Sequence, residues 1–390
     1  MKKVLFISPN YIFGYSGGSI SQRRIYDGLK NLKNNNKIDF KTISLDNNRC
    51  LEVCVPIHKS KRKDIISRIL GHSNYLFTEL KKIKKEVKEY RPDIIILGSS
   101  RLGFIAKELK KINVNIDVFT NFDNVEYDYV NAYFIMKKGV KGKILKLIEK
   151  LVVYNDEKLA VKYSEKLIFL TQRDEKRIKE IYKLDNNKNV IIPICIEQQK
   201  QLIINNKKKS IVFLGSLNYG SNVDAIIWFI ENVWRKYYDD SDDIKLIVAG
   251  SNADCKLIEL VNNCRNIKLF NGFKDLIDVV PINSLLIAPI RVGAGMKVKI
   301  AEALSLGISV AASKEALIGY EEGVDFQNKK NINIINEANT EEEYKKCIDN
   351  FVIEDESILL NKGILAKKIF EEKYSYKFSR NIIEKILFNK

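Results

Sequence analysis

Short apolar runs alternate with amphipathic stretches along most of the chain. Residues 3–8 (KVLFIS), 93–98 (DIIILG) and 166–170 (KLIFL) have the length and composition of buried strands. Segments with helical periodicity lie between such runs, for example residues 19–32 (SISQRRIYDGLKNL), where Ser19 could cap the helix start. Further predicted strands of this half span residues 38–44, 51–55, 116–120 and 189–193. The alternation predicts a mostly parallel sheet with helices on both faces.

The same pattern starts again after a polar segment. Residues 197–209 (EQQKQLIINNKKK) end in a lysine run and are predicted to link two domains. The second domain begins with a strand, a glycine turn and a helix (SIVFLGSLNYGSNVDAIIWFIENVW), and KLIVAGS, IKLFNGF and SLLIAPI follow as strands. We therefore predict an α/β fold of two Rossmann-like, doubly wound domains, residues 1–196 and 210–373, that face a cleft, with an amphipathic helix over residues 374–390.

Composition places the protein among globular, intracellular proteins. Of its 390 residues 45% are hydrophobic and 29% charged, and no apolar run approaches the roughly 18 residues of a membrane span. The start, MKKVLFISPNY, resembles a first strand more than a signal peptide. Cys50, Cys54 and His58 could suggest a metal site, but we favour reduced structural thiols. The run DDSDD (239–243) is expected to be a solvated loop rather than a metal site.

The formal net charge of +17 is unevenly distributed. Residues 59–91 hold eleven basic and four acidic side chains, and residues 136–150 hold six lysines and one acid. Such a surface suits an anionic membrane or a phosphate-bearing ligand, whereas no nucleic-acid-binding motif is present. Residues 138–154 in particular could rest on an anionic membrane, or could form a solvated lysine-rich helix face.

Two loops that follow predicted strands are rich in small residues. Residues 9–19 (PNYIFGYSGGS) contain Gly17 and Gly18, which allow backbone to approach a ligand before a helix whose N-terminus favours phosphate. An ordinary tight turn would have the same sequence. Residues 215–220 (GSLNYG) lack the dinucleotide fingerprint, so a nicotinamide cofactor is not indicated, but they suit contact with a sugar or phosphate.

The third loop opens a strand-helix-strand crossover, residues 291–310 (RVGAGMKVKIAEALSLGISV). Its glycines allow the loop to wrap around a ligand, and Arg291 and Lys297 supply positive charge beside a helix N-terminus, as a diphosphate requires. Glu302 follows Lys297 by about 7 Å along the helix axis and could accept hydrogen bonds from ribose hydroxyls. Alternatively, Glu302 points to solvent and pairs with Lys299.

These motifs together resemble the retaining glycosyltransferases of the GT-B fold, family four. The resemblance covers nearly the whole chain and is strongest over residues 211–320, where LIVAGS, NGF, APIRVGAGMKVKIAEALSLGISVAAS and IGYEEG follow in the family's order. In the first domain it rests on SGGS (16–19) and NFDNVEYDY (121–129). It implies a nucleotide-sugar donor held mainly by the second domain, an acceptor held mainly by the first, and a final helix that crosses back to the first.

The resemblance also implies roles for individual residues. Asp123, Arg291 and Lys297 would be catalytic. The residues that would bind the nucleotide sugar are Gly17, Gly18, Gly215, Ser216, Asn218, Gly272, Phe273, Gly293, Ala294, Gly295, Met296 and Glu302.

Four positions depart from the family pattern. Ala294 stands where many members carry a glutamate, and Ser216 and Ser221 stand where many carry arginine and lysine. Asp123 lies where many carry histidine. Arg291 and Lys297 would then supply the missing positive charge.

The sequence thus predicts a retaining, metal-independent hexosyltransferase without a required cofactor. The donor would be a UDP- or GDP-sugar and the acceptor a glycan or a lipid-linked saccharide, in the synthesis of a surface polysaccharide. The protein would be cytoplasmic and could be peripheral on the inner face of the membrane. A non-catalytic sugar-nucleotide-binding partner subunit and, less favoured, a sugar-nucleotide epimerase are the alternatives.

Overall fold

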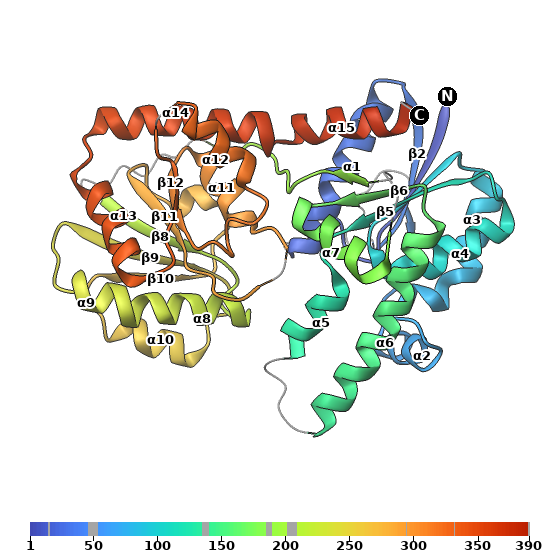
Figure 1. Cartoon of the computed structure of the whole chain (residues 1–390), viewed down its shortest axis with the longest axis horizontal. Helices are drawn as coiled ribbons and strands as arrows, with labels where there is room; N and C mark the ends of the chain where they lie inside the picture. The colour runs from blue at the N-terminus through green and yellow to red at the C-terminus, as the bar shows by residue number, and fades with distance from the viewer. Residues whose placement is uncertain are drawn as a thin grey trace. The chain divides into compact units, whose positions relative to one another are not determined.

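The structure, a computed structural model, divides the chain into two units (Figure 1). One unit comprises Met1–Cys195 with Tyr376–Lys390, and the other comprises Ile196–Ser375. The structure describes residues 1–14, 16–45, 54–134, 140–184, 189–200, 209–293, 295–330 and 332–388. Most of the predicted linker, residues 201–208, lies outside these ranges, and so does Ala294.

The first unit is built on a seven-stranded sheet in the order β3-β2-β1-β4-β5-β6-β7. All described pairings in it are parallel. The strand order reverses between β1 and β4, and in open sheets ligands bind beyond the carboxyl ends of the strands at such a switch point. The strands are β1 (Lys2–Ile7), β2 (Ile38–Ser44), β3 (Cys54–Pro56), β4 (Ile94–Leu97), β5 (Asp117–Phe122), β6 (Lys166–Phe169) and β7 (Asn189–Ile191).

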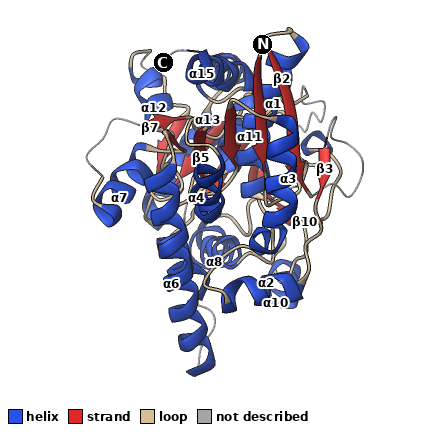
Figure 2. Cartoon of the chain, turned by 90° about the vertical axis from the view of Figure 1, so that its right-hand side faces the viewer, coloured by secondary structure: helices blue, strands red, loops and turns tan. Residues whose placement is uncertain are grey.

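Helices cover both faces of this sheet (Figure 2). They are α1 (Gly17–Asn34), α2 (Lys61–Ile69), η1 (Tyr75–Glu79), α3 (Leu80–Tyr90), η2 (Ser100–Leu102), α4 (Gly103–Ile112), α5 (Glu126–Phe134), α6 (Val140–Tyr163), α7 (Gln172–Tyr182) and α15 (Tyr376–Phe388).

The alternation of side chains along β1 explains why two cores form. Val4 and Phe6 pack into one buried cluster together with residues of α1 and α15. Leu5 and Ile7 point to the other face and pack into a second cluster with residues of α3 and α4. Because successive side chains of a strand face opposite ways, an entirely apolar strand requires cover on both sides.

The C-terminal helix α15 completes the first of these cores. Ile383 and Leu387 are buried in the cluster with α1. A Cβ at Gly28 of α1 would lie 2.5 Å from the Ile383 side chain, so glycine permits the two helices to approach closely. Arg380 adds a bidentate ion pair to Asp27, with N–O distances of 2.7 and 2.9 Å.

The second unit is built on a six-stranded parallel sheet in the order β10-β9-β8-β11-β12-β13. Its strands are β8 (Lys209–Leu214), β9 (Ile244–Gly250), β10 (Ile267–Asn271), β11 (Ser284–Ala288), β12 (Ser309–Ala312) and β13 (Ile335–Glu337). Its helices are α8 (Gly220–Phe229), η3 (Ile230–Trp234), α9 (Arg235–Tyr237), α10 (Cys255–Asn262), η4 (Leu276–Asp278), α11 (Val298–Leu306), α12 (Glu321–Asn328), α13 (Glu341–Ile353) and α14 (Glu356–Lys373). The predicted architecture of two Rossmann-like α/β domains is confirmed.

Several local predictions require correction. Helix α1 begins at Gly17, and its cap is Ser16, whose side chain accepts a hydrogen bond from the Ser19 amide. The strand predicted over residues 51–55 is observed as β3 (Cys54–Pro56), and residues 51–53 lie outside the described ranges. Strand β13 was not predicted, because three residues at a sheet edge leave little periodicity to detect.

Among the described residues, no group of three or more His, Cys, Asp or Glu side chains is arranged to hold a metal ion. None of the described cysteines, Cys54, Cys195, Cys255, Cys264 and Cys347, forms a disulfide, and Cys50 lies outside the described ranges. Burial raises the pKa of the Cys195 thiol to about 12. Residues 239–243 form a turn before β9. Among the described helices, none combines the length and the apolar character that crossing a bilayer would require.

Candidate functional site

The glycine-rich loop of the second unit leads directly into α11. Lys297 is the residue before the helix, and its Nζ donates a hydrogen bond to the Gly295 carbonyl at 2.7 Å. A Cβ at Gly293 would lie 3.0 Å from that Nζ, so glycine leaves room for the lysine to fold back over the loop. Gly295 has φ of +63°, a left-handed conformation that glycine adopts without strain. Met296 is buried beneath the loop.

Tyr320 fixes the start of α11 from below. Its buried hydroxyl donates to the Lys297 carbonyl at 2.7 Å and accepts from the Ala301 amide at 3.1 Å. Both bonds use backbone groups of the first turn, so the entrance of the helix is held independently of any ligand. In the sequence, this tyrosine is distinguished only as part of IGYEEG.

Arg291 is paired within the second unit rather than free at the loop. Its guanidinium makes two hydrogen bonds to the Asp224 carboxylate, at 3.1 and 2.6 Å, and lies 5.9 Å above the Trp228 ring. Both members of the ion pair are about half exposed, so the pair contributes little stability. Asp224 and Trp228 belong to α8, and the pair therefore joins the β11 loop to α8.

Lys299, which sequence analysis treated only as a surface partner of Glu302, is buried. It is 7% exposed. Its Nζ donates to the Asn222 side chain at 2.9 Å and lies 4.3 Å from the centre of the Phe213 ring. Burial lowers the pKa of this ammonium to about 7, although the charge of Glu302 opposes the shift.

Glu302 lies one turn further along α11 and is partly buried. Burial raises the pKa of its carboxyl to about 7, against the opposing charge of Lys299. No hydrogen bond joins this carboxylate to another described residue. A partly buried acceptor that makes no hydrogen bond destabilises the unliganded fold, and it is suited to accept hydrogen bonds from the hydroxyl groups of a ligand.

The loop after β8 is folded against the same helix. A Cβ at Gly215 would lie 2.7 Å from Asn222 Nδ2 and 3.1 Å from Lys299 Nζ, so only glycine fits there. Asn222 Nδ2 donates to the Ser216 carbonyl at 3.0 Å, and Ser216 Oγ donates to Asn218 Oδ1 at 2.8 Å. Asn222 thus holds this loop and Lys299 together, a role that sequence analysis missed.

The loop after β10 joins the same sheet edge. Gly272 has φ of +108°, and its amide donates to the Gly250 carbonyl at the end of β9, at 2.6 Å. A Cβ at Gly250 would in turn overlap the Gly215 carbonyl oxygen. The carboxyl ends of β8, β9 and β10 are therefore in direct contact. The side chain of Phe273 is 37% exposed beside them.

In the first unit, Gly17 and Gly18 form the first turn of α1 rather than the loop before it. A Cβ at Gly17 would contact nothing within 4 Å. One at Gly18 would lie 3.2 Å from the Asn10 amide nitrogen and 3.8 Å from Asp123 Oδ2. The start of α1 therefore lies beside Asp123, and Gly17 and Gly18 add no side chain there.

Asp123 follows β5 and is surrounded by hydrogen-bond donors. Its carboxylate accepts from Ser21 and Asn121, and from Gln22 at 3.2 Å. Arg24, fully buried, donates to Asn121 at 2.9 Å and to Ser21. Burial raises the pKa of Asp123 to about 6, although the hydrogen bond from Ser21 and the charge of Arg24 both lower it.

The predicted site residues thus form two groups. One, with Gly17, Gly18 and Asp123, lies at the carboxyl edge of the first sheet. The other lies at the carboxyl edge of the second sheet and comprises Gly215, Ser216, Asn218, Gly272, Phe273, Arg291, Gly293, Gly295, Met296, Lys297 and Glu302. Lys299, Asn222 and Tyr320 are additions. Lys299 could have been found from the sequence, because it lies three residues before Glu302 on an otherwise apolar helix.

A comparison with protein families matches this part of the chain. Residues 208–352 match the model of the family described as "Glycosyl transferases group 1". The matched residues lie within the second unit. A protein of Klebsiella pneumoniae described as "Uncharacterized 44.6 kDa protein in cps region" is 25% identical over 306 residues, which is 64% of this chain and 77% of that protein.

Solved glycosyltransferases share the whole two-domain fold. WaaG, described as a glycosyltransferase involved in lipopolysaccharide biosynthesis, superposes with a TM-score of 0.68 at 15% identity, over 99% of this chain and 100% of that one. Anabaena Alr3699/HepE, solved in complex with UDP-glucose, superposes with a TM-score of 0.60 at 12% identity, over 99% of each chain. The fold is that of the GT-B glycosyltransferases.

Proposed function

We propose that this protein is a retaining, metal-independent glycosyltransferase. It moves a hexose from a UDP- or GDP-sugar to a glycan or lipid-linked acceptor, in the synthesis of a surface polysaccharide. The family match over residues 208–352 supports the transferase class, and the description of the K. pneumoniae relative supports polysaccharide synthesis. The bound UDP-glucose of Alr3699/HepE supports a nucleotide-sugar donor.

The observation that carries the donor site is the carboxylate of Glu302 without a hydrogen-bond partner among the described residues. Its burial beside Lys299 favours a ligand that offers both hydroxyl donors and negative charge. A nucleoside diphosphate has both, because ribose hydroxyls donate and phosphate oxygens accept. We assign the ribose to Glu302 and the diphosphate to Lys297 and the amides of the 291–297 loop.

The transfer itself requires little covalent chemistry from the protein. The bond between the anomeric carbon and the diphosphate oxygen breaks, and the electron pair leaves with the diphosphate. The acceptor oxygen attacks the same face of the sugar, and its proton passes to the departing phosphate oxygen. Lys297 and Arg291 would stabilise the growing negative charge, and preorganised charged donors of this kind contribute several kcal/mol.

Asp123 has a different task. It is held by Ser21, Gln22 and Asn121, so its orientation is fixed before any ligand arrives. A carboxylate of this kind can orient a donor-sugar hydroxyl or assist the transfer of the acceptor proton. A nucleotide-sugar donor and a lipid-linked acceptor would meet at the cytoplasmic face of the membrane.

Calorimetric titration of the purified protein with UDP, GDP and their glucose conjugates tests the donor site. Glu302→Gln and Lys297→Ala are each expected to lower the affinity for the preferred nucleotide at least tenfold, because each removes one charged contact with it. Glu342→Gln and Lys346→Ala, exposed on α13, serve as matched controls and should bind as the wild type does. Equal affinities in all variants would remove the assigned site. Binding without any sugar transfer or hydrolysis would instead favour the partner-subunit alternative.

A further inference from the structure

Arg24 of α1 is enclosed in the interior of the first unit. Its side chain is fully buried, and its Nε atom makes no hydrogen bond to any described residue. A buried guanidinium destabilises a fold unless hydrogen bonds and a negative charge compensate it, and an apolar side chain of similar length would avoid this cost. A compensating negative charge close to Arg24 is therefore required.

The carboxylate of Asp123 supplies this negative charge. Burial lowers the pKa of the Arg24 guanidinium to about 10, whereas Asp123 and the Cys195 thiol both raise it. Burial in turn raises the pKa of that thiol to about 12, so Cys195 is uncharged at neutral pH. Of these two neighbours, Asp123 is therefore the one that carries a charge when Arg24 does.

Two side chains connect the guanidinium to one oxygen of the Asp123 carboxylate. Arg24 Nη1 donates to Ser21 Oγ at 2.5 Å, and this hydroxyl donates in turn to Asp123 Oδ1. Arg24 Nη2 donates to Asn121 Oδ1 at 2.9 Å, and the amide nitrogen of Asn121 donates to the same oxygen of Asp123. Both paths run from donor to acceptor without a break, so the positive charge of Arg24 stabilises a negative charge on Asp123 Oδ1.

The other carboxylate oxygen, Asp123 Oδ2, is held less tightly and lies beside the start of α1. It accepts from Gln22 Nε2 at 3.2 Å, and Ser8 orients this amide by donating to Gln22 Oε1. A Cβ at Gly18 would lie 3.8 Å from Oδ2, so the glycine leaves this side of the oxygen without a side chain. The carboxylate is thus divided between an oxygen bound to the interior and an oxygen next to the glycines of α1.

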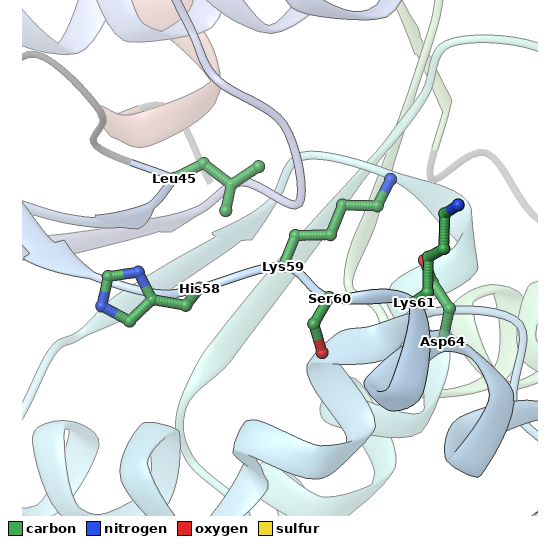
Figure 3. Close-up of a pocket in the computed structure, with 6 residues that line it drawn as sticks. All are labelled: Leu45, His58, Lys59, Ser60, Lys61 and Asp64. Carbon is green, nitrogen blue, oxygen red and sulfur yellow. The ribbon is translucent and has the colours of Figure 1, made fainter.

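Neither histidine of the chain belongs to this cluster. His58 lines an open pocket of about 430 Å³ at the start of α2 (Figure 3). The other residues that line this pocket are Leu45, Lys59, Ser60, Lys61 and Asp64. His72 lies 2.9 Å from an oxygen of Asp156 of α6, through its Nδ1 atom, and it stacks on Phe77. The ionisation of Asp123 is therefore governed by other groups.

The charges that act on Asp123 come from α1 and α5. Burial raises the pKa of Asp123, Arg24 of α1 lowers it, and Glu126 of α5 raises it. Glu126 is itself paired with Arg101 at 2.7 Å. Arg24 is thus the charge that favours the ionised form of Asp123 against the effect of burial.

We propose that Arg24 is a positioning residue that keeps Asp123 ionised and directs its Oδ2 to the ligand. This role rests on the proposed function, because Arg24 would act on sugar transfer only through Asp123. An ionised Oδ2 can accept a hydrogen bond from a hydroxyl of the donor sugar or of the acceptor. Protonation would turn one carboxylate oxygen into a donor and weaken this property.

A double-mutant cycle tests the pairing without any substrate. The wild type, Arg24→Met, Asp123→Asn and the double variant are compared by urea unfolding followed by circular dichroism. Each single substitution leaves a buried charge without its partner, so the double variant should lose clearly less stability at pH 8 than the sum of the two single losses. At pH 5 this coupling should be much smaller, because Asp123 is then largely protonated. If Arg24→Met does not fold, Arg24→Gln takes its place in the cycle.

The pH dependence of sugar transfer gives a measurement that a merely structural role of Arg24 would not affect. Arg24→Gln should move the inflection near pH 6 upward by about one pH unit or more, and Arg24→Lys, which retains the charge, should move it less. His58→Gln is one control, and Arg380→Gln, which removes an arginine paired with Asp27 of α1, is the matched control. Both should keep the inflection of the wild type.

The two measurements separate a failure of this inference from a failure of the proposed function. Additive losses of stability in an active transferase, or an unmoved inflection in Arg24→Gln, would overturn the role of Arg24 alone. Coupling between Arg24 and Asp123 in a protein that transfers no sugar would instead contradict the proposed function, and with it the role of the pair in transfer.

Discussion

Replacement of Glu302 by glutamine should stabilise the unliganded second unit while it weakens nucleotide binding. The fold raises the pKa of this carboxyl from 4.5 to about 7. Each pH unit corresponds to about 1.4 kcal/mol, so the ionised form costs the folded state up to about 3 kcal/mol at pH 8. Glutamine has the same shape without the charge. Its amide must still be buried in part, so we expect a net gain of about 1–2 kcal/mol.

The sign of the pH dependence gives the sharper measurement. A raised pKa means that the folded state holds the proton longer than the unfolded chain does. The stability of the wild type therefore falls relative to that of the variant as the pH rises from 4.5 to 7, and the difference is then constant. The only tryptophans of the chain, Trp228 and Trp234, both lie in the second unit. Urea unfolding followed by tryptophan fluorescence therefore reports on this unit directly.

The control for this measurement is an exposed glutamate of the same unit. Glu342→Gln, on the exposed face of α13, should give the same unfolding midpoint as the wild type at every pH. A Glu302→Gln variant that is no more stable than the wild type at pH 8 would show that burial does not strain this carboxylate. The assignment of Glu302 as a ligand-binding residue would then lose its physical basis, because a carboxylate that burial does not destabilise does not require a hydrogen-bond donor from a ligand.

Two further predictions concern the first unit. Gly103→Ala should destabilise this unit by about 3 kcal/mol or more in urea unfolding followed by circular dichroism, because its Cβ would lie 1.9 Å from the Asp156 carbonyl oxygen and 2.3 Å from the Ala160 nitrogen. Gly17→Ala, whose Cβ contacts nothing within 4 Å, is the control and should change stability by less than about 1 kcal/mol; similar losses in both variants would contradict the packing argument. If catalysis requires ionised Asp123, whose pKa is about 6, the transfer rate should fall about tenfold per pH unit below that value. Ser21→Ala removes a hydrogen bond that lowers this pKa and should move the inflection to higher pH, and an unmoved inflection would exclude Asp123 as the titrating group.

The fold was predictable because central strands of both sheets are short, mostly apolar runs. Strands such as β4 (IIIL) and β11 (SLLIA) are buried at every residue, which is characteristic of a parallel sheet covered on both faces. The edges were harder. β13 has only three residues and was not predicted, and of the strand predicted over residues 51–55 only Cys54 and Val55 lie in the described ranges. The position of the α1 cap was misjudged because Ser16 and Ser19 are both suitable residues and only geometry selects between them.

The candidate site was predictable as a set of loops but not as a set of contacts. The glycines and charges of residues 291–302 indicated an anion site, and the structure places the loop at the start of α11. The sequence could not show that Arg291 pairs with Asp224, because the two residues belong to different elements. It also could not show that Lys299 is buried against Phe213 and Asn222. A long side chain can lie in solvent or pack against other parts of the protein, and only the folded structure shows which of the two occurs.

The position of α15 has a consequence for how the protein is made. Its apolar face belongs to the core of the first unit, yet ribosomes would deliver it only after all of residues 196–375. The face of α1 around Leu29 therefore stays exposed in the nascent first unit while the second unit is translated. Domains usually begin to fold as they emerge, so this apolar face is exposed, and prone to aggregation, until α15 has been synthesised.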